Sequence, residues 1–435
     1  MKKIISLFSS LVFVFLLNGC GSDSADTEPP FSACNDGVVL DQFPCSEVGL
    51  YAHVTLEQLN GTRANDLWGW TDPETSKEYA LVGLIDGVSI VEVTDPANPV
   101  FIGKLQEATA PSSQALADPV PMHDEEAGGF KEASSWRDIK VYDNFMLVVS
   151  EERTHGMQIF DLERLRDVDS VPANFTHDAL YDKIGNAHNV AVNEESGFAY
   201  TVGTTTGEVC AEAGGLHIVN LINPLQPEFA GCHLEPEAGG VIANGYIHDT
   251  QCVIYGGPDA RFRGRELCFS SSERKLLISD VTDKSAPETI AVVGYSGNQY
   301  SHQGWLSEDH AFFFMNDELD ERNNQHNTRT YVWDLEDLEN PEMTGFYQHQ
   351  TNSVDHNLYV LNNLAYQANY TSGLRILDVS GHSPETFSEL GFFDTTPNNN
   401  APVFAGLWSN YPWLSGNKVI VSDINNGLFI LRFKR

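Results

Sequence analysis

Short apolar segments with a period of two residues, separated by Gly, Asn and Pro, fill the chain from Val48 onward. Two stretches show the recurring unit, NAHNVAVNEESGFAYTVGT and VDHNLYVLNNLAYQANYTSGLRILDV. Each unit has a polar pair, an apolar run, a turn, an aromatic or apolar segment and a second turn. A strand of the form G-L-x-I-x-D/N follows, and then a final strand after Pro. Four strands per unit are typical of a β-propeller blade.

Seven units align on their opening pairs, and third strands such as GMQIFDL, GLHIVNL and GLRILDV recur in them. The openings are 51 to 60 residues apart, except for one gap of 72 that a Pro-, Ala- and Asp-rich insertion at 108–129 explains. We therefore predict an all-β fold, a seven-bladed β-propeller, in preference to a ring of six or eight blades. Its blades open near Asp66, Asp138, Asn189, Asp249, Gln303, Asn357 and Asn410.

The last unit has only three strands before Arg435. The segment VGLYAHVTL, Val48 to Leu56, precedes the first unit and has no other place in the pattern. We predict that this N-terminal strand completes the last blade and closes the ring, because closure removes two exposed sheet edges.

The first residues have the form of an export signal. Lys2 and Lys3 precede a short apolar run, and Leu17-Asn18-Gly19-Cys20 matches a bacterial lipobox. We predict a lipoprotein signal peptide at 1–19, a lipidated Cys20 with a flexible tether at 20–32, and the propeller at 33–435. Gly21, in place of Asp, favours an outer-membrane or cell-surface location in a bacterium.

The net charge of the chain is −36, and it is −38 once Lys2 and Lys3 leave with the signal. Nucleic acids and anionic lipid surfaces need a basic footprint on the protein, so this balance argues against both as partners. A solvated acidic surface explains it most simply.

Six cysteines remain beside Cys20, and an exported protein meets an oxidising compartment. Six cysteines allow fifteen pairings. We favour neighbours because each such pair brackets a turn or hairpin. The pairs are Cys34 with Cys45, Cys210 with Cys232, and Cys252 with Cys268.

Several motifs in order resemble the choice-of-anchor B family, which is related to LVIVD-repeat proteins. They include WGWTDP, SSWRDIKVYDN, HGMQIFDL, NTRTYVWDL and YQANYTSGLRILDV, and the resemblance covers the mature chain. It implies an exported protein with a variable anchor, here a lipobox. It brings no known activity and no catalytic residues.

The first strand of a propeller blade is innermost, so the opening pairs should surround the mouth of the central channel. The turns between second and third strands should lie beside them on the same face. The candidate residues from the pairs are His188, His248, His302, His356, Arg137, Asp138, Asn189, Asp249 and Asn357, and those from the turns are Glu151, Asp317, Asn369 and Asp423.

Two interpretations of these pairs remain open. We favour latches, in which each pair hydrogen-bonds to the neighbouring blade, because buried polar groups need partners. The alternative is a ligand or metal site, with His188, His248, His302 and His356 as candidate ligands of a divalent cation. The acidic run NDELDE at 316–321 suits calcium in its residue types, but we expect a solvated loop there.

No G-x-S-x-G, P-loop, G-x-G-x-x-G or H-E-x-x-H motif occurs, and the S-x-x-K match at 272–275 lies in an expected hairpin turn. We therefore predict a surface-anchored binding or scaffold module without assigned catalytic residues. Its partners would be the membrane, through the lipid, and a protein, small molecule or carbohydrate. The alternative is a metal-dependent, hydrolase-like enzyme that uses the His-rich mouth. We expect Trp136, Trp305, Trp408 and Trp413 in the core, although a tryptophan at the rim would suit stacking on a sugar or a flat ligand.

Overall fold

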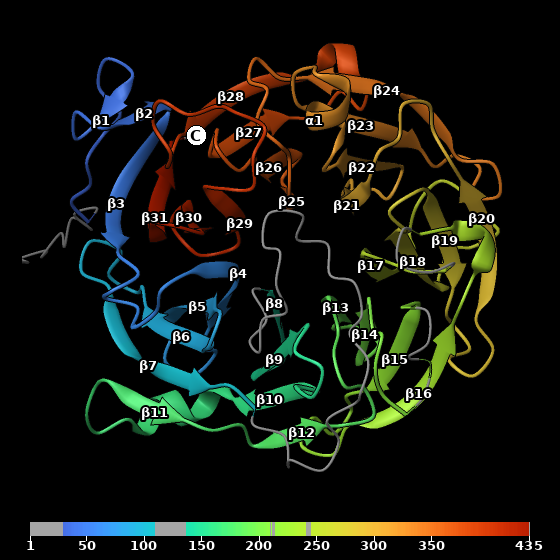
Figure 1. Cartoon of the computed structure of the whole chain (residues 1–435), viewed down its shortest axis with the longest axis horizontal. Helices are drawn as coiled ribbons and strands as arrows, with labels where there is room; N and C mark the ends of the chain where they lie inside the picture. The colour runs from blue at the N-terminus through green and yellow to red at the C-terminus, as the bar shows by residue number, and fades with distance from the viewer. Residues whose placement is uncertain (1–28, 109–135, 209, 211–213, 241–244, 435) are drawn as a thin grey trace, which may run out of the picture.

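The computed structural model describes residues 29–108, 136–208, 210, 214–240 and 245–434. Within these residues, seven sheets of antiparallel strands surround a central axis as a seven-bladed β-propeller (Figure 1), which confirms the predicted fold. The helices of the described part are short: α1 (Asp320–Asn324), η1 (Leu162–Asp167), η2 (Pro236–Ala238) and η3 (Pro384–Thr386). None of the described helices is long and apolar enough to cross a membrane. The predicted signal peptide, Cys20 and nearly all of the 108–129 insertion lie outside the described residues.

The blades follow one another in chain order, and the strands of each blade are named from the innermost to the outermost. Blade 1 is β4 (Ala64–Thr71), β5 (Glu78–Leu84), β6 (Gly87–Glu92) and β7 (Val100–Gln106). Blade 2 is β8 (Arg137–Tyr142), β9 (Phe145–Ser150), β10 (Met157–Asp161) and β12 (Ala179–Tyr181). Blade 3 is β13 (Asn189–Asn193), β14 (Phe198–Val202), β15 (Leu216–Asn220) and β16 (Glu228–His233). Blade 4 is β17 (Asp249–Ile254), β18 (Glu266–Ser271), β19 (Leu276–Asp280) and β20 (Glu288–Val293).

The remaining three blades complete the circle. Blade 5 is β21 (Ser301–Leu306), β22 (Phe312–Asp317), β23 (Arg329–Asp334) and β24 (Glu342–Gln348). Blade 6 is β25 (Leu358–Leu361), β26 (Leu364–Ala368), β27 (Leu374–Asp378) and β28 (Ser388–Phe393). Blade 7 is β29 (Leu407–Tyr411), β30 (Lys418–Asp423), β31 (Gly427–Phe433) and β3 (Val48–Val54).

The N-terminal strand closes the ring, as the sequence predicted. β3 pairs antiparallel with β31, from Val48 opposite Phe433 to Val54 opposite Leu428. A strand from near the N-terminus and the last described strand, β31, therefore share one blade. The ends of the propeller are joined by a hydrogen-bonded ladder in place of two open edges.

Extra strands extend two blades beyond the predicted four. β11 (Ala173–Phe175) runs parallel to β7 on the outside of blade 1. The hairpin of β1 (Val38–Val39) and β2 (Phe43–Ser46) adds to β28 of blade 6. These additions cover outer edges that would otherwise be exposed.

Apolar side chains lie on both faces of each blade, because successive residues of a strand point to opposite faces. In β31, Leu428 and Ile430 pack toward blade 1, whereas Phe429 and Leu431 pack toward blade 6. A hydrophobic cluster of this kind fills every one of the seven blade-to-blade interfaces. Burial of both faces explains why the strands read as nearly continuous apolar runs.

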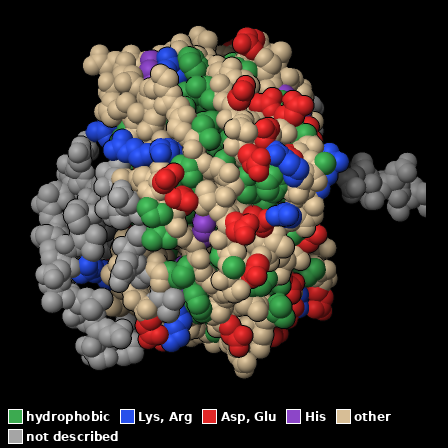
Figure 2. Space-filling model, turned by 90° about the vertical axis from the view of Figure 1, so that its right-hand side faces the viewer, with side chains coloured by type: hydrophobic (Ala, Val, Ile, Leu, Met, Phe, Trp, Pro, Cys, Tyr) green, Lys and Arg blue, Asp and Glu red, His purple; other side chains and the backbone are tan. Residues whose placement is uncertain are grey.

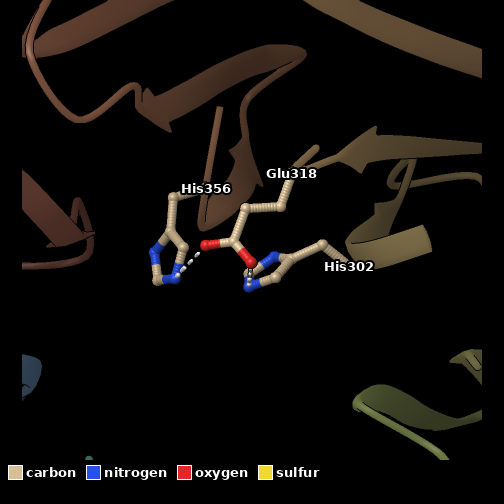
Figure 3. A group of neighbouring side chains, drawn as sticks. All are labelled: His302, Glu318 and His356. Atoms are coloured by element: carbon tan, nitrogen blue, oxygen red, sulfur yellow. Dashed lines mark ion pairs between the residues drawn. The ribbon is translucent and has the colours of Figure 1, made fainter. Parts of the chain in front are cut away.

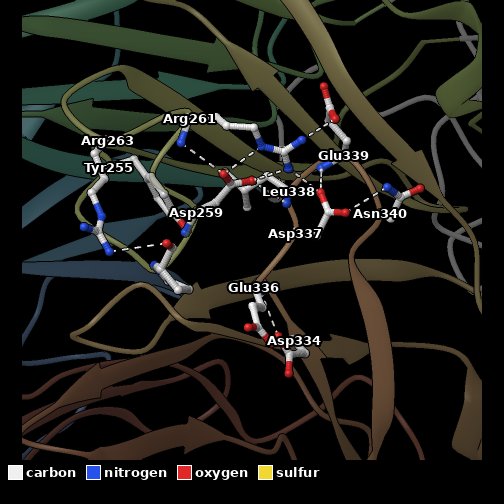
Figure 4. Close-up of polar contacts among 11 residues, drawn as sticks. Tyr255, Asp259, Arg261, Arg263, Asp334, Glu336, Asp337, Leu338, Glu339 and Asn340 are labelled. Carbon is white, nitrogen blue, oxygen red and sulfur yellow. Dashed lines mark hydrogen bonds and ion pairs between the residues drawn. The ribbon is translucent and has the colours of Figure 1, made fainter.

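Polar contacts also join neighbouring blades at the periphery. Arg261, in the β17–β18 loop of blade 4, contacts Asp337 and Glu339 in the β23–β24 turn of blade 5 (Figure 4). Its neighbour Asp259 accepts a hydrogen bond from the Leu338 amide at 3.1 Å. Side chains of Asp and Glu are spread over the side of the ring (Figure 2), which agrees with the strongly negative net charge.

Three disulfides join the neighbouring cysteines that the sequence favoured. They are Cys34–Cys45, Cys210–Cys232 and Cys252–Cys268. The last links β17 to β18, where the two cysteines are directly opposite each other in the ladder. Three disulfides are typical of a protein in an oxidising, extracytoplasmic compartment.

Candidate functional site

Four histidines form a continuous row at one end of the inner strands. Each belongs to a different one of four successive blades: His188, His248, His302 and His356. Neighbouring ring centres are 4.2, 4.3 and 4.4 Å apart along the row. The repeat places these residues together because each one opens an inner strand, and inner strands converge on the axis.

Two of the imidazoles are held by the backbone of the next blade. His248 Nδ1 is 3.0 Å from the carbonyl oxygen of His302, and His356 Nδ1 is 2.6 Å from that of Trp408. A carbonyl oxygen only accepts hydrogen bonds, so in each ring Nδ1 carries a proton. If the His356 ring is neutral, its Nε2 therefore presents a lone pair. These bonds are of the kind that the latch interpretation predicted.

The carboxylate of Glu318 lies between two histidines of the row (Figure 3). Its Oε2 is 3.8 Å from Nε2 of His302, and its Oε1 is 3.7 Å from Nε2 of His356. One ligand atom from each of these residues lies within 4.8 Å of the other two. Tyr370 donates a hydrogen bond to Oε1 at 2.8 Å, which orients the carboxylate.

Burial determines the protonation states of His302, His356 and Glu318. It lowers the pKa of His356 to about 3 and that of His302 well below its usual value, so both rings are neutral at pH 7. Burial also raises the pKa of Glu318 to about 7. When ionised, this carboxylate faces two neutral rings, of which His356 turns a bare nitrogen toward it. A cation between them would satisfy all three groups.

The two distances from the Glu318 carboxylate to the imidazoles are compatible with one metal ion. Two ligand atoms that each lie about 2.1 Å from an ion are roughly 3.0 Å apart at a right angle and about 4.2 Å apart when opposite. The distances of 3.7 and 3.8 Å from Glu318 to His356 and His302 fall within this range. Metal binding requires neutral imidazole, and burial of both rings provides it.

His188, at the other end of the row, is engaged differently. Its Nδ1 is 2.6 Å from Oε1 of Glu151. Burial lowers the pKa of His188, but the carboxylates of Glu151, Asp249 and Glu318 together outweigh this effect and raise the pKa above its usual value. His188 therefore forms an ion pair when protonated and lies outside the three-residue group.

Arg137 and the second members of the predicted pairs mostly join blades. The Arg137 guanidinium contacts Glu107, His155 and the Leu84 carbonyl. The contacts of the others are: Asp138 with the Val190 amide and Lys140, Asn189 with the His248 carbonyl, Asn357 with Ser409 and Asp66, and Asp249 with the Thr250 amide.

The predicted turn residues, Glu151 included, lie outside the three-residue group. Asp317 accepts hydrogen bonds from Tyr295 and from the Gln299 and Tyr300 amides, and Asp423 caps its own turn. Asn369 is fully buried, and neither atom of its side-chain amide has a hydrogen-bond partner among the described residues.

The expectation of a solvated acidic loop at 316–321 is wrong. Asp317, Asp320 and Glu321 are each exposed by 1% or less. Tyr331 donates a hydrogen bond to Asp320 at 2.6 Å. Burial raises the pKa values of Asp317 and Asp320 to about 6 each. Hydroxyl and amide donors from other segments reach Asp317 and Asp320, and the composition of the run does not reveal these donors.

The sequence does not single out Glu318 and Tyr370, although both belong to the site. Glu318 lies in the run NDELDE, and nothing in that run indicates which of its carboxylates faces the axis. β22 ends at Asp317, so Glu318 is the first residue beyond the strand. A search for carboxylates immediately after second strands would have found it.

No family model and no curated protein matches this chain. Among solved structures, the chain is similar to the crystal structure of the computationally designed Ika8 protein. The two share 8% sequence identity and a TM-score of 0.46, over 85% of this chain and 83% of that one. A likeness at this level carries no argument about function.

Proposed function

We propose that this protein is an exported β-propeller binding module that holds a divalent transition-metal ion at its channel mouth. The ligands are His302, His356 and Glu318. The observation that carries the proposal is the Glu318 carboxylate, whose side chain is only 13% exposed and which lies 3.7 to 3.8 Å from the Nε2 atoms of two neutral imidazoles.

The donor set defines the class of metal. Two imidazoles and one carboxylate suit borderline ions such as Zn²⁺ or Fe²⁺, whereas Ca²⁺ prefers six or more oxygen ligands. Tyr370 and the Trp408 carbonyl orient the set, because Tyr370 donates a hydrogen bond to Glu318 and the Trp408 carbonyl accepts one from Nδ1 of His356. Three protein ligands leave a coordination position for a group from a binding partner.

The N-terminal sequence supports attachment to a membrane. The lipobox ending at Cys20 supports a lipid anchor, and the resemblance to the choice-of-anchor B family agrees with one. We place this anchor at the outer membrane or cell surface of a bacterium. The three disulfides agree with export. Changing Cys20→Ala should move the protein from the membrane fraction to the soluble fraction without changing its melting temperature. Unchanged membrane retention would exclude the lipobox as the anchor.

A metal-dependent hydrolase is the second candidate, and the same three ligands favour it. Catalytic zinc sites keep three protein ligands and an open position, at which a bound water loses a proton near pH 7. Hydrolysis of ester and phosphate-ester test substrates by metal-loaded protein, abolished in Glu318→Gln, would support this candidate. If the protein binds the metal but hydrolyses none of these substrates, the result would favour the binding module over the hydrolase.

Metal content and titration test the proposal. Purified protein should contain or take up one transition-metal ion per chain, measured by elemental analysis and isothermal titration with Zn²⁺, Fe²⁺, Mn²⁺ and Ca²⁺. His302→Ala and His356→Ala should lose this binding. His349→Gln is the matched control, since His349 is buried but hydrogen-bonds to Thr330 outside the group. Equal uptake by wild type and both alanine variants would overturn the proposal.

A further inference from the structure

A cluster of aromatic side chains occupies the opposite ends of the inner strands. It contains Trp68 of β4, Trp305 of β21, Tyr359 of β25, Tyr411 of β29 and Trp413 just beyond. Tyr359 lies edge-on to both Trp68 and Trp305, with ring centres 5.7 and 5.0 Å away. His302 and His356 open β21 and β25, two of these strands, so the cluster and the proposed metal site lie toward different ends of the channel.

A pocket opens beside this cluster. Trp68, Trp305 and Tyr359 contribute its aromatic wall, and Lys140, Asp249 and Gln251 contribute polar groups. It has about 480 Å³ of empty space, part of which is open to solvent. Trp68 and Trp305 are partly exposed, whereas Tyr359 is buried and supports both. Aromatic walls with a few fixed polar groups are typical of small-molecule sites.

The polar groups of the pocket are held in place by the propeller itself. The Gln251 side-chain oxygen accepts a hydrogen bond from the Leu306 amide at 2.8 Å, which leaves its NH₂ group as the donor end. One oxygen of Asp249 accepts a hydrogen bond from the Thr250 amide at 2.6 Å. Fixed donors and acceptors of this kind recognise hydroxyl groups.

The charges of the pocket disfavour an ionic ligand of either sign. Lys140 Nζ lies 4.7 Å from the centre of the Trp68 ring, so a second cation on that face would be repelled. The charge of Lys140 is already matched by Asp138 at 2.5 Å and Asp66 at 3.4 Å. Asp249 and the net charge of −36 oppose an anion.

We propose that this pocket binds a neutral carbohydrate of one or two sugar units. The apolar C–H face of a sugar ring packs on Trp68 or Trp305. Its hydroxyls hydrogen-bond to Gln251 and Asp249. The apolar face and the hydroxyls of a sugar thus match the aromatic rings and the polar groups of the pocket. This site is independent of the metal site at the other end of the channel.

Calorimetry and tryptophan fluorescence with disaccharides test this assignment. The neutral probes are maltose, cellobiose, lactose and N,N′-diacetylchitobiose, with digalacturonate as the anionic and chitobiose as the cationic comparator. We expect at least one neutral probe to bind, and Trp68→Ala and Trp305→Ala each to weaken its binding at least 10-fold. Trp136→Ala should bind normally, because Trp136 packs against Trp408 beside the histidine row. Adding a chelator should change nothing.

Two milder variants guard against loss of folding. Trp305→Phe keeps a stacking ring and should retain part of the binding. Gln251→Glu keeps an acceptor for the Leu306 amide but loses the NH₂ donor, so it should weaken binding with little change in melting temperature. The assignment is overturned if no neutral probe binds, or if a charged comparator binds in preference. It is also overturned if the Trp68, Trp305 and Gln251 variants bind like wild type, or if a chelator abolishes sugar binding.

Discussion

The Nδ1 atom of His356 donates a hydrogen bond to the carbonyl oxygen of Trp408 at a distance of 2.6 Å. This bond joins blade 6 to blade 7. It also leaves Nε2 of the same neutral ring facing Glu318, at 3.7 Å. The latch and ligand interpretations of the histidines are therefore not alternatives, because one imidazole has a nitrogen for each role.

The latch role predicts a stability loss that does not depend on metal. His356→Ala leaves the buried Trp408 carbonyl without its donor, which should cost about 1–3 kcal/mol of unfolding free energy. Chemical denaturation of wild type and variant, both in chelator, measures this cost. A variant as stable as wild type in chelator would mean that the ring is held for its ligand role alone.

Ring closure predicts that substitutions of two leucines near the N-terminus reduce stability by very different amounts. Leu50 of β3 is 3% exposed and packs between blades 6 and 7, whereas Leu40 is 64% exposed. Leu50→Ala should cost about 2–5 kcal/mol. Leu40→Ala, the matched control, should change stability by less than about 0.5 kcal/mol. Equal effects in denaturant titrations would argue against a structural role for the closing strand.

In the peripheral contact between blades 4 and 5, Asp259 should contribute more to stability than Arg261. Asp259 is buried and accepts a hydrogen bond from the Leu338 amide, so Asp259→Ala should cost about 1–3 kcal/mol. The Arg261 side chain is 49% exposed, so Arg261→Met should cost less than about 1 kcal/mol. Denaturation of both variants at moderate salt checks this order, and a costlier Arg261 change would contradict it.

The buried His349 side chain should make the stability of the protein fall as the pH is lowered. Burial lowers its pKa to about 3 in the folded protein, below the usual 6.5, so the unfolded chain binds the proton more readily. Its contribution to stability is therefore lost as the pH falls from 6.5 toward 3. His349→Gln should lose less stability than wild type between pH 6.5 and pH 4, as followed by denaturant titration. The same pair compared at pH 8, where both side chains are neutral, is the control. Parallel pH profiles would refute this assignment.

The fold could be predicted because its determinants are local and repeated. Polar opening pairs, period-two strands and the unassigned segment at 48–56 together specified seven blades and their closure. The histidine row followed from the same alignment, since equivalent positions meet at the axis. The extra strands β1, β2 and β11 could not be predicted, because they carry no repeat and because β2 and β11 pair with strands distant in sequence.

The composition of the candidate site could be predicted only in part. Glu318 and Asp317 are neighbours in one acidic run, yet only Glu318 meets the histidines, while Tyr295 and two backbone amides hold Asp317. That division depends on where β22 ends, which the sequence does not mark. The partly exposed Trp305 and Trp413 belong to the aromatic cluster at the far end of the channel. Trp136 and Trp408 lie beside the histidine row, so the four tryptophans do not share one role.

Thermal melting of wild type and Glu318→Gln, with chelator and with each divalent transition metal, tests the central claim most directly. The substitution keeps a hydrogen-bond acceptor for Tyr370 but removes the charge. Wild type should gain stability with one ion, by about 2.7 kcal/mol when free metal is 100 times the dissociation constant. Glu318→Gln should gain little or nothing from that ion. In chelator at pH 8 it should be at least as stable as wild type, because it lacks a buried carboxylate. A wild type indifferent to every ion, or a variant with the full metal-dependent gain, would contradict the account.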